Sequence, residues 1–248
     1  MIPLTIVILA AGKGTRMKSE RPKVLHPLMG RPMLAYSLDL TRALEPSEIL
    51  VVIGYKADMV RKAFQEWPVK FVLQDPQEGT AHAVKTALRE ISQETGTLLI
   101  LSGDAPLLTE ETLRGFLDTH NEQKSLLSFI TAVLSDPYGY GRVVRGKNGQ
   151  VISVIEETDA GEKDREIKEV NGGIYLMELP FLREAIDKVT SQNSQREFYL
   201  TDLIAIAGQW GKLTTFRIKD FREILGINTM AELSSVEKIL EERFKCAV

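Results

Sequence analysis

Short, nearly continuous apolar runs recur along the first 104 residues of the chain. Runs of this kind are typical of strands that are buried on both faces of a parallel sheet. We predict such strands at 4–9, 49–54, 69–74 and 97–104. Two intervals between them carry apolar residues at helical spacing, which predicts one helix over 60–67 and another over 81–88.

The rest of the chain mixes further strands with three more helices. Thr109 followed by two glutamates predicts a helix start, because acidic residues stabilise the positive end of the helix dipole. An apolar stripe predicts a second helix over 200–207, and the capping-box spacing of Thr229 and Glu232 predicts a terminal helix. The remaining strands are predicted at 126–134, 141–145, 151–157, 170–177, 213–218 and 223–227. The polar stretch 158–169 is expected to be a mobile surface loop.

Alternation of strands and helices with short connections predicts a single α/β domain over 1–248, built on a doubly wound, mostly parallel sheet. In such sheets the ligand binds beyond the carboxyl ends of the strands. The loops that this rule selects are Ala10–Gly14, Gln74–Thr80 and Gly103–Pro106.

The composition is that of an ordinary soluble protein, with 44% apolar residues, 26% charged residues and a net charge of −3. This balance gives no reason to expect binding to nucleic acid or to an anionic membrane. The apolar N-terminus lacks a basic flank and is too short to span a bilayer. A single cysteine, Cys246, cannot form an internal disulfide, so we expect a reducing, cytoplasmic location.

The loop after the first strand, "LAAGKGTRMKSERPK" at 9–23, concentrates positive charge in an acidic chain. It does not match the dinucleotide fingerprint, because Met17 stands where the third glycine belongs, and it fails the P-loop spacing. Two interpretations remain. Glycines and cationic side chains can surround a nucleoside triphosphate, or the loop can be a solvated surface segment that is basic by chance.

Several motifs in order resemble those of the sugar nucleotidyltransferases, and most closely the uridylyltransferase domain of bacterial N-acetylglucosamine-1-phosphate uridylyltransferases. The resemblance covers nearly the whole chain. Its motifs are "LAAGKGTRM", "PKVLHPLMGRPML", "VLQDPQEGTAHAV", "GDAPLL", "DPYGYGRVVR", "VIEE", "VNGG", "EFYLTD" and "GIN". It implies a Rossmann-like, nucleotide-diphospho-sugar transferase fold with a doubly wound, mixed, mostly parallel sheet.

The resemblance also implies a reaction. A sugar-1-phosphate oxygen would attack the α-phosphorus of UTP and expel pyrophosphate, which would give UDP-N-acetylglucosamine, a cell-wall precursor. Arg16 and Lys23 would be the catalytic residues, with Arg16 on the outgoing pyrophosphate and Lys23 between the reacting phosphates. Asp104 and Asn228 would bind Mg²⁺, which prefers one or two protein oxygens together with substrate phosphates. A turn residue and a helix-start residue are the alternative roles for these two side chains.

Two further residue sets are implied in the same way. Those expected to bind the nucleotide are Leu9, Ala10, Ala11, Gly12, Gln74, Gly79, Thr80 and Gly103. Those expected to bind the sugar are Gly141, Glu156, Asn171, Tyr199 and Thr201. Purely structural roles stay open for them, as strand ends, helix starts or turn residues.

The resemblance divides the expected domain into a nucleotide-binding half (1–108), a sugar-phosphate-binding half (109–228) and a terminal helix (229–248). Hexapeptide repeats are absent from the sequence, so no β-helix acetyltransferase domain is expected in it. The sequence departs from the family pattern at Ser102, where an aromatic residue is usual, and at Gly172, where a threonine is usual. Both departures bear on the identity of the sugar.

Three alternatives therefore stay open: transfer to another sugar- or polyol-phosphate, use of another pyrimidine triphosphate, and a catalytically silent nucleotide-sugar sensor. A Rossmann oxidoreductase is disfavoured by the failed fingerprint. His26, His82 and His120 lack the spacing of metal ligands, and we expect His120 to be a solvated residue at a helix end. The oligomeric state is left open.

Overall fold

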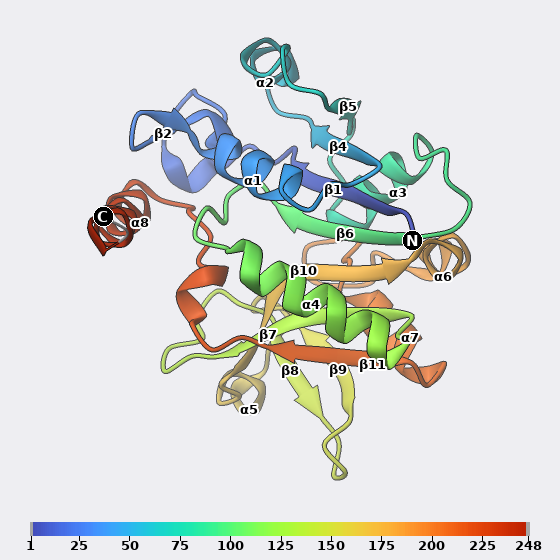
Figure 1. The fold of residues 1–248 in the computed structure, drawn as a ribbon. Coiled ribbons are helices and arrows are strands. Elements are labelled where there is room, and N and C mark those ends of the chain that lie inside the picture. The colour runs from blue at the N-terminus through green and yellow to red at the C-terminus, as the bar shows by residue number, and fades with distance from the viewer. Residues whose placement is uncertain (1, 247–248) are drawn as a thin grey trace.

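The computed structural model describes residues 2–246 and contains one central sheet with helices on both faces (Figure 1). The order of strands across the sheet is β11 (Leu213–Arg217), β7 (Leu127–Val133), β10 (Glu169–Glu178), β6 (Thr97–Ser102), β1 (Leu4–Ala10), β4 (Glu48–Ile53) and β5 (Lys70–Leu73). Only β10 runs antiparallel to its neighbours along this path, so the predicted mixed, mostly parallel sheet is confirmed.

A second ladder branches from β10. There β8 (Arg142–Arg145) pairs with both β10 and β9 (Val151–Ile155), and all of these pairs are antiparallel. A small separate ladder joins β2 (Pro27–Leu28) to β3 (Arg31–Pro32). The branch extends below the main sheet in Figure 1, beside the short helix α5.

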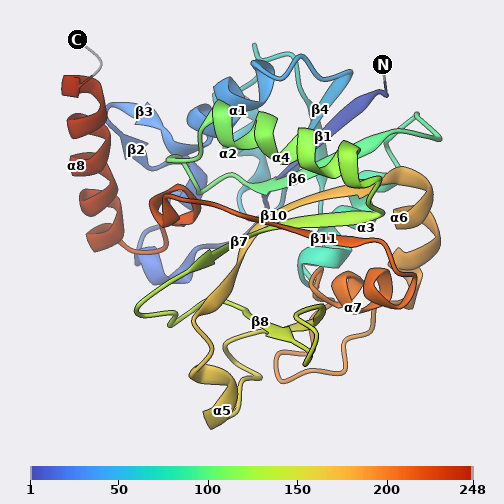
Figure 2. The ribbon, with the colours of Figure 1, turned by 60° about the horizontal axis from the view of Figure 1, so that its bottom comes forward.

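The helices form two layers because successive strand residues point to opposite faces of the sheet. One buried cluster joins alternate strand residues such as Val7 to α3, α6 and α7, and the other joins Ile6 and Ile8 to α1, α2 and α4. Figure 2 shows α3, α6 and α7 together on one side of the sheet. The bounds are α1 (Met33–Arg42), α2 (Ala57–Ala63), α3 (Thr80–Leu88), α4 (Glu110–Gln123), α5 (Glu162–Arg165), α6 (Leu179–Ala185) and α7 (Asp202–Gln209).

The terminal helix α8 (Met230–Cys246) packs outside these layers. Its Leu233, Val236 and Leu240 form a third buried cluster with the segment that follows β1, including Met17 and Leu28. The predicted capping box is confirmed, because the Glu232 carboxylate accepts from the Thr229 amide (2.9 Å) and the Glu232 amide donates to the Thr229 hydroxyl (3.2 Å). The side chain of Cys246 lies outside the described residues, as do residues 247 and 248.

Three predictions about local structure are wrong. Residues 223–227 form no strand, because the Asp220 side chain caps a short 3-10 turn over Phe221–Ile224 instead. The helix expected over 60–67 ends at Ala63, and Pro68 keeps the following turn from continuing as a helix.

The third concerns His120, which is 1% exposed rather than solvated. Its ring nitrogens lie 2.8 Å from Ser128 Oγ and 3.2 Å from Glu178 Oε1, because the end of α4 packs on β7 and β10.

The helix expected over 200–207 begins two residues later, because Leu200 precedes α7. The stretch 158–169, expected to be a loop, contains the one-turn helix α5. The predicted cap at Thr109 is confirmed, since its hydroxyl accepts from the Thr112 amide at 3.2 Å. One sheet runs through both expected halves of the domain, and their assignment to nucleotide and sugar stays a prediction.

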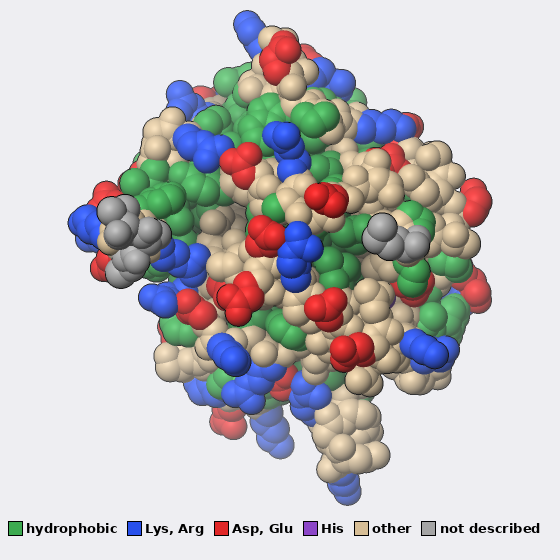
Figure 3. Space-filling view, viewed as in Figure 1, with side chains coloured by type: hydrophobic (Ala, Val, Ile, Leu, Met, Phe, Trp, Pro, Cys, Tyr) green, Lys and Arg blue, Asp and Glu red, His purple; other side chains and the backbone are tan. Residues whose placement is uncertain are grey.

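Acidic and basic side chains are interspersed over the face of the molecule that carries α1 and α4 (Figure 3). Within residues 2–246, none of the helices combines the length and the apolar character that crossing a bilayer requires.

Candidate functional site

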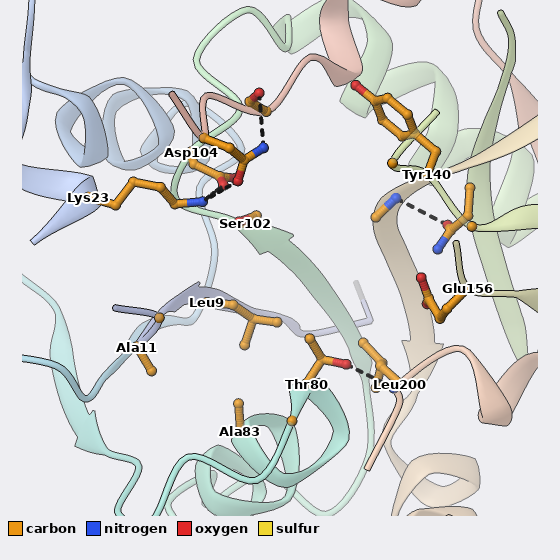
Figure 4. Close-up of a pocket in the computed structure, with 18 of the residues that line it drawn as sticks. Leu9, Ala11, Lys23, Thr80, Ala83, Ser102, Asp104, Tyr140, Glu156 and Leu200 are labelled. Atoms are coloured by element: carbon orange, nitrogen blue, oxygen red, sulfur yellow. Dashed lines mark hydrogen bonds and ion pairs between the residues drawn. The ribbon is translucent and has the colours of Figure 1, made fainter. Parts of the chain in front are cut away.

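A cavity of about 690 Å³ opens at the edge of the sheet where the parallel strands β1, β4 and β6 end. The segment after β1 and the start of α3 form one wall, and the turn before β8, Glu156 directly after β9 and the first part of β10 form the other (Figure 4). Because β10 runs antiparallel, it is the beginning of this strand, with Asn171, that reaches the same edge.

All but two of the residues predicted to form a site line this cavity. They are Leu9, Ala10, Ala11, Gly12, Arg16, Lys23, Gln74, Gly79, Thr80, Asp104, Gly141, Glu156, Asn171, Thr201 and Asn228. They come from loops and strand ends far apart in the sequence, so the topology of the sheet is what brings them together.

Gly103 and Tyr199 do not line the cavity. The amide of Gly103 donates to the Leu9 carbonyl at 3.0 Å, and a Cβ on it would lie 2.9 Å from the Leu34 side chain. The Tyr199 hydroxyl donates to Gln195 Oε1 at 2.9 Å, away from the cavity. Gly103 therefore supports the β1 loop through its backbone, while Tyr199 anchors the segment from which Leu200 and Thr201 reach the cavity.

A charged cluster occupies one end of the cavity. The Lys23 ammonium forms an ion pair with Asp104 and donates to Asn228 Oδ1 at 3.0 Å (Figure 4). Lys23 follows the glycine-rich loop, Asp104 follows β6 and Asn228 precedes α8. Glu232 fixes the backbone of Asn228, because its carboxylate accepts from the main-chain amide of Asn228 at 2.6 Å.

The glycine-rich loop shapes this end of the cavity through Gly14. Its φ of +64° lies in the left-handed region, and a Cβ there would be 2.7 Å from Lys23 Cβ. Glycine thus gives the Lys23 side chain room to cross toward Asp104. The 3-10 turn that follows places Arg16 at the cavity and buries Met17 against α8.

The donor set at this end suits a hard cation. The Asp104 carboxylate and the Asn228 amide oxygen both converge on the Lys23 ammonium, so two oxygen ligands already face one positive charge. Mg²⁺ typically binds one or two protein oxygens and keeps the rest of its ligands from water and phosphate. Residues 2–246 contain no cluster of three or more His, Cys, Asp or Glu side chains that could hold a metal ion.

The wall formed by β5 and α3 holds groups suited to a planar base. Gln74 is 4% exposed, and its amide nitrogen donates to the Gly79 carbonyl at 3.0 Å. Gly79 has a φ of +108°, and a Cβ on it would collide with the Phe198 backbone at 2.6 Å. The Thr80 hydroxyl accepts from the Leu200 amide at 2.9 Å, which joins this wall to the opposite one (Figure 4).

The opposite wall carries a half-buried carboxylate. Glu156 Oε1 accepts from the Thr201 hydroxyl at 2.9 Å. Burial raises the pKa of Glu156, the Thr201 hydrogen bond opposes this shift, and the nearby carboxylates Asp159 and Asp202 add to it. A carboxylate in this position can accept hydrogen bonds from ligand hydroxyls.

Asn171 lies beside this carboxylate on the same wall. Its amide donates to the Tyr175 hydroxyl at 2.6 Å, and its Oδ1 accepts from the Gly173 amide at 3.1 Å. The strand is irregular between Asn171 and Tyr175, where Gly173 has a φ of +72° and a Cβ on Gly172 would lie 2.8 Å from Ile224. The Gly-Gly pair therefore allows the bend that turns Asn171 to the cavity.

Four further cavity residues had been singled out without a site role: Lys13 and Gln77 lie in the selected loops, and Ser102 and Gly172 are the departures from the family pattern. The cavity residues that the sequence analysis missed are Val24, Ala83, Tyr138, Gly139, Tyr140, Gly173, Tyr175, Glu197, Leu200, Ile224, Gly226 and Glu232. One of these had a signal in the sequence, because Ala83 lies one helical turn after Thr80. Tyr175 and Ile224 reach the cavity only through the fold, and nothing in their local sequence indicates it.

Comparisons with known proteins add independent information. A model of the MobA-like NTP transferase domain matches residues 6–165. The bifunctional protein GlmU of Geobacter metallireducens is 42% identical over 242 residues, which are 97% of this chain and 51% of that protein. GlmU of Streptococcus agalactiae serotype V is 40% identical over 238 residues, which are 96% of this chain and 52% of that protein. The chain thus spans about half the length of these relatives.

Solved structures agree on the fold. A Bacillus anthracis protein provisionally named a glucose-1-phosphate thymidylyltransferase superposes with a TM-score of 0.76 at 20% identity, over 95% of this chain and 94% of its own. HddC from Yersinia pseudotuberculosis gives a TM-score of 0.70 at 21% identity, over 97% of this chain and 100% of its own.

Proposed function

Because the chain belongs to the family of MobA-like NTP transferase domains, we propose that it transfers a uridylyl group from UTP to N-acetylglucosamine-1-phosphate and releases pyrophosphate. The observation that carries the proposal is the arrangement of one cavity: the Lys23–Asp104–Asn228 cluster at one end and the Glu156–Thr201 pair on the acceptor wall. The relationship to GlmU supports the choice of this nucleotide and sugar.

In this reaction the protein aligns two anionic substrates and stabilises charge, since phosphoryl-type transfer needs little covalent chemistry from side chains. Arg16 lies at the cavity next to the glycine-rich loop and would bind the leaving pyrophosphate. Lys23 would neutralise the α-phosphate and the attacking phosphate from its position beside Asp104.

Asp104 and Asn228 would hold Mg²⁺, which when bound supplies positive charge to the phosphates. The Glu232 carboxylate accepts from the main-chain amide of Asn228 and so holds the backbone that carries this side chain.

Recognition of the two organic groups falls to the two walls. Gln74 would hydrogen-bond the uracil edge, with its amide oriented by the Gly79 carbonyl. Glu156 and Asn171 would bind the sugar hydroxyls and the acetamido group, and Gly141 leaves space beside Glu156 for the sugar.

The test is an assay of pyrophosphate release with Mg²⁺, UTP or dTTP, and a panel that includes N-acetylglucosamine-1-phosphate and glucose-1-phosphate. We expect the highest kcat/KM with UTP and the N-acetylated sugar. Higher kcat/KM with another sugar or with dTTP would contradict the assignment of the acceptor or the base. UTP binding without release for any pair would contradict the assignment as an enzyme and favour a nucleotide-sugar sensor.

A further inference from the structure

An ion pair between a buried arginine and a partly exposed glutamate lies directly behind the acceptor wall. Arg142, the first residue of β8, is 2% exposed and is the largest fully buried side chain among the described residues. Its guanidinium nitrogen Nη2 lies 2.8 Å from Glu157 Oε2, and its Nη1 donates to the Tyr140 carbonyl. Neither Arg142 nor Glu157 lines the cavity.

Glu157 joins three segments through one carboxylate. Its Oε2 also accepts from the Gly139 amide at 3.0 Å, and its Oε1 lies 3.7 Å from Arg165 Nε on α5. Burial acts to raise the pKa of Glu157, but the hydrogen bonds from Arg142 and Gly139 outweigh it and lower the pKa. The carboxylate is therefore ionised at neutral pH, where it can hold both the arginine and the turn.

The neighbours of this pair are the residues that face the cavity. Gly141 directly precedes Arg142, and Glu156 directly precedes Glu157. Gly141 and Glu156 line the acceptor wall of the cavity, while Arg142 and Glu157 lie behind it. A Cβ on Gly141 would lie 3.3 Å from Glu156 Oε2, and the Gly141 carbonyl accepts from the main-chain amide of Asn171 at 2.9 Å. A shift of the 138–141 turn would consequently change the space between Gly141, Glu156 and Asn171.

Besides the Glu157 carboxylate, the turn is anchored at its end, where the Gly141 carbonyl meets β10, and by the Tyr140 side chain, which packs against the buried cluster of α1, α2 and α4. Tyr138 is 78% exposed at the rim of the cavity, and Gly139 has a φ of +84°. Its local hydrogen bonds run to residues within the same turn, from the Tyr138 amide to Asp136 and from the Tyr140 amide to Pro137. Arg142 and Glu157 add contacts at the middle of the turn, through the Tyr140 carbonyl and the Gly139 amide.

A buried ion pair is weak evidence of stability, because desolvation offsets much of the attraction between the charges. The planar guanidinium of Arg142 nevertheless fixes the orientation of its two acceptors as well as their distance. It contacts the Glu157 carboxylate and the Tyr140 carbonyl at the same time. We propose that Arg142 and Glu157 are positioning residues that hold the Tyr138–Gly141 turn and Glu156 at the spacing that recognises the sugar of the acceptor. This inference rests on the proposed uridylyltransferase function.

The test compares conservative variants of this pair with those of a matched pair on the same strand. Arg145 and Glu169 also form a bidentate ion pair, between β8 and β10, but neither lines the cavity nor contacts the turn. The variants are Arg142→Lys, Glu157→Gln and their combination, with Arg145→Lys and Glu169→Gln as controls. KM for N-acetylglucosamine-1-phosphate and the Kd of Mg²⁺–UTP, by calorimetry, are measured for each.

We expect Arg142→Lys and Glu157→Gln each to raise the KM for the sugar phosphate about tenfold, the scale of one hydrogen bond to a charged group. The Kd for UTP should change less than twofold, and the double variant should lose no more than the larger single effect. Glu157→Gln keeps the volume of the side chain, so the test does not depend on Arg142→Lys alone. The controls should leave both constants unchanged.

A second measurement needs no substrate. Hydrogen exchange at the Gly139 amide, followed by NMR, should be faster in Glu157→Gln than in the wild type and unchanged in Glu169→Gln. An active wild type whose sugar-phosphate KM is unaffected in both test variants overturns the positioning role alone. A wild type that makes no product overturns the proposed function, and the acceptor role falls with it.

Discussion

Lys23 and Asp104, 81 residues apart in the chain, form an ion pair at one end of the cavity. The side chains of both residues are largely buried, with exposed fractions of 16% and 12%. The Asn228 oxygen completes the arrangement at 3.0 Å from the Lys23 ammonium. A cation and two oxygen ligands are thus placed together where a triphosphate and a divalent ion would have to meet.

Replacement of Lys23 tests the cationic part of this arrangement. Lys23→Ala should lower kcat about 100- to 1000-fold, the scale measured for loss of one group that stabilises a transition state. Lys18→Ala is the matched control, because Lys18 is an exposed cation of the same loop that does not line the cavity. Steady-state kinetics should show wild-type turnover for Lys18→Ala. Equal losses in both variants would mean that the loop acts only through its overall charge.

Alanine substitutions at Gly14 and Gly30 distinguish the effect of backbone strain from the effect of displacing Lys23. Both have a positive φ, +64° and +77°, but only at Gly14 would a Cβ meet a neighbour, Lys23 Cβ at 2.7 Å. Gly14→Ala and Gly30→Ala should each destabilise the fold by about 1–2 kcal/mol, measured by urea unfolding. Only Gly14→Ala should also lower kcat, by about tenfold or more, because the added Cβ displaces Lys23. A similar loss of kcat in Gly30→Ala would contradict this role for Gly14.

Gln74 tests the assignment of the base-binding wall. Gln74→Ala should raise the KM for UTP more than the KM for the sugar phosphate, because the amide lies at the wall of β5 and α3. The expected effect on UTP is about tenfold, the scale of one buried hydrogen bond that is left unmade. Initial rates with each substrate varied in turn give both constants. An equal rise in the two would argue against recognition of the base by this residue.

The raised pKa of Glu156 predicts how the free energy of unfolding changes with pH. Burial raises its pKa above the ordinary value of 4.5 in the folded state. Between the two values the folded protein holds more protons than the unfolded chain, so stability falls as pH rises through this window. Glu156→Gln removes this dependence, and its unfolding free energy relative to the wild type should increase as pH rises through the window.

The measurement is urea unfolding of both proteins from about pH 4 to about pH 8. Glu162→Gln, which changes an exposed carboxylate on α5, is the control and should give a curve parallel to the wild type. A constant difference between Glu156→Gln and the wild type across this range would show that the pKa of Glu156 is unshifted by folding.

The sequence predicted the sheet well because its strands are continuous apolar runs with few alternative structures. Nine strands and the helices that start at Thr80, Glu110 and Met230 appear close to their predicted positions. The family resemblance read from the motifs is confirmed by the match to residues 6–165 and by the relationship to GlmU.

The features that the sequence did not predict depend on contacts between segments far apart in the chain. His120 looked like a solvated helix end, but the position of α4 on the sheet buries it, which no local pattern reveals. The apolar residues at 223–227 suggested a strand, whereas Glu223 accepts from the amide and hydroxyl of Thr109 and holds the segment in a turn. The contribution of Tyr175 to the cavity depends on a bend in β10 that only the pairing with β7 makes visible.

The most direct test of the central claim measures UDP-N-acetylglucosamine, by mass spectrometry, formed from UTP and N-acetylglucosamine-1-phosphate in Mg²⁺. The wild type is compared with Asp104→Ala and with Asp118→Ala, which removes an exposed carboxylate of α4. We predict product from the wild type and from Asp118→Ala, and a rate roughly 100- to 1000-fold lower from Asp104→Ala. An Asp104→Ala rate close to that of the wild type, or a wild type that forms no product, would contradict the account.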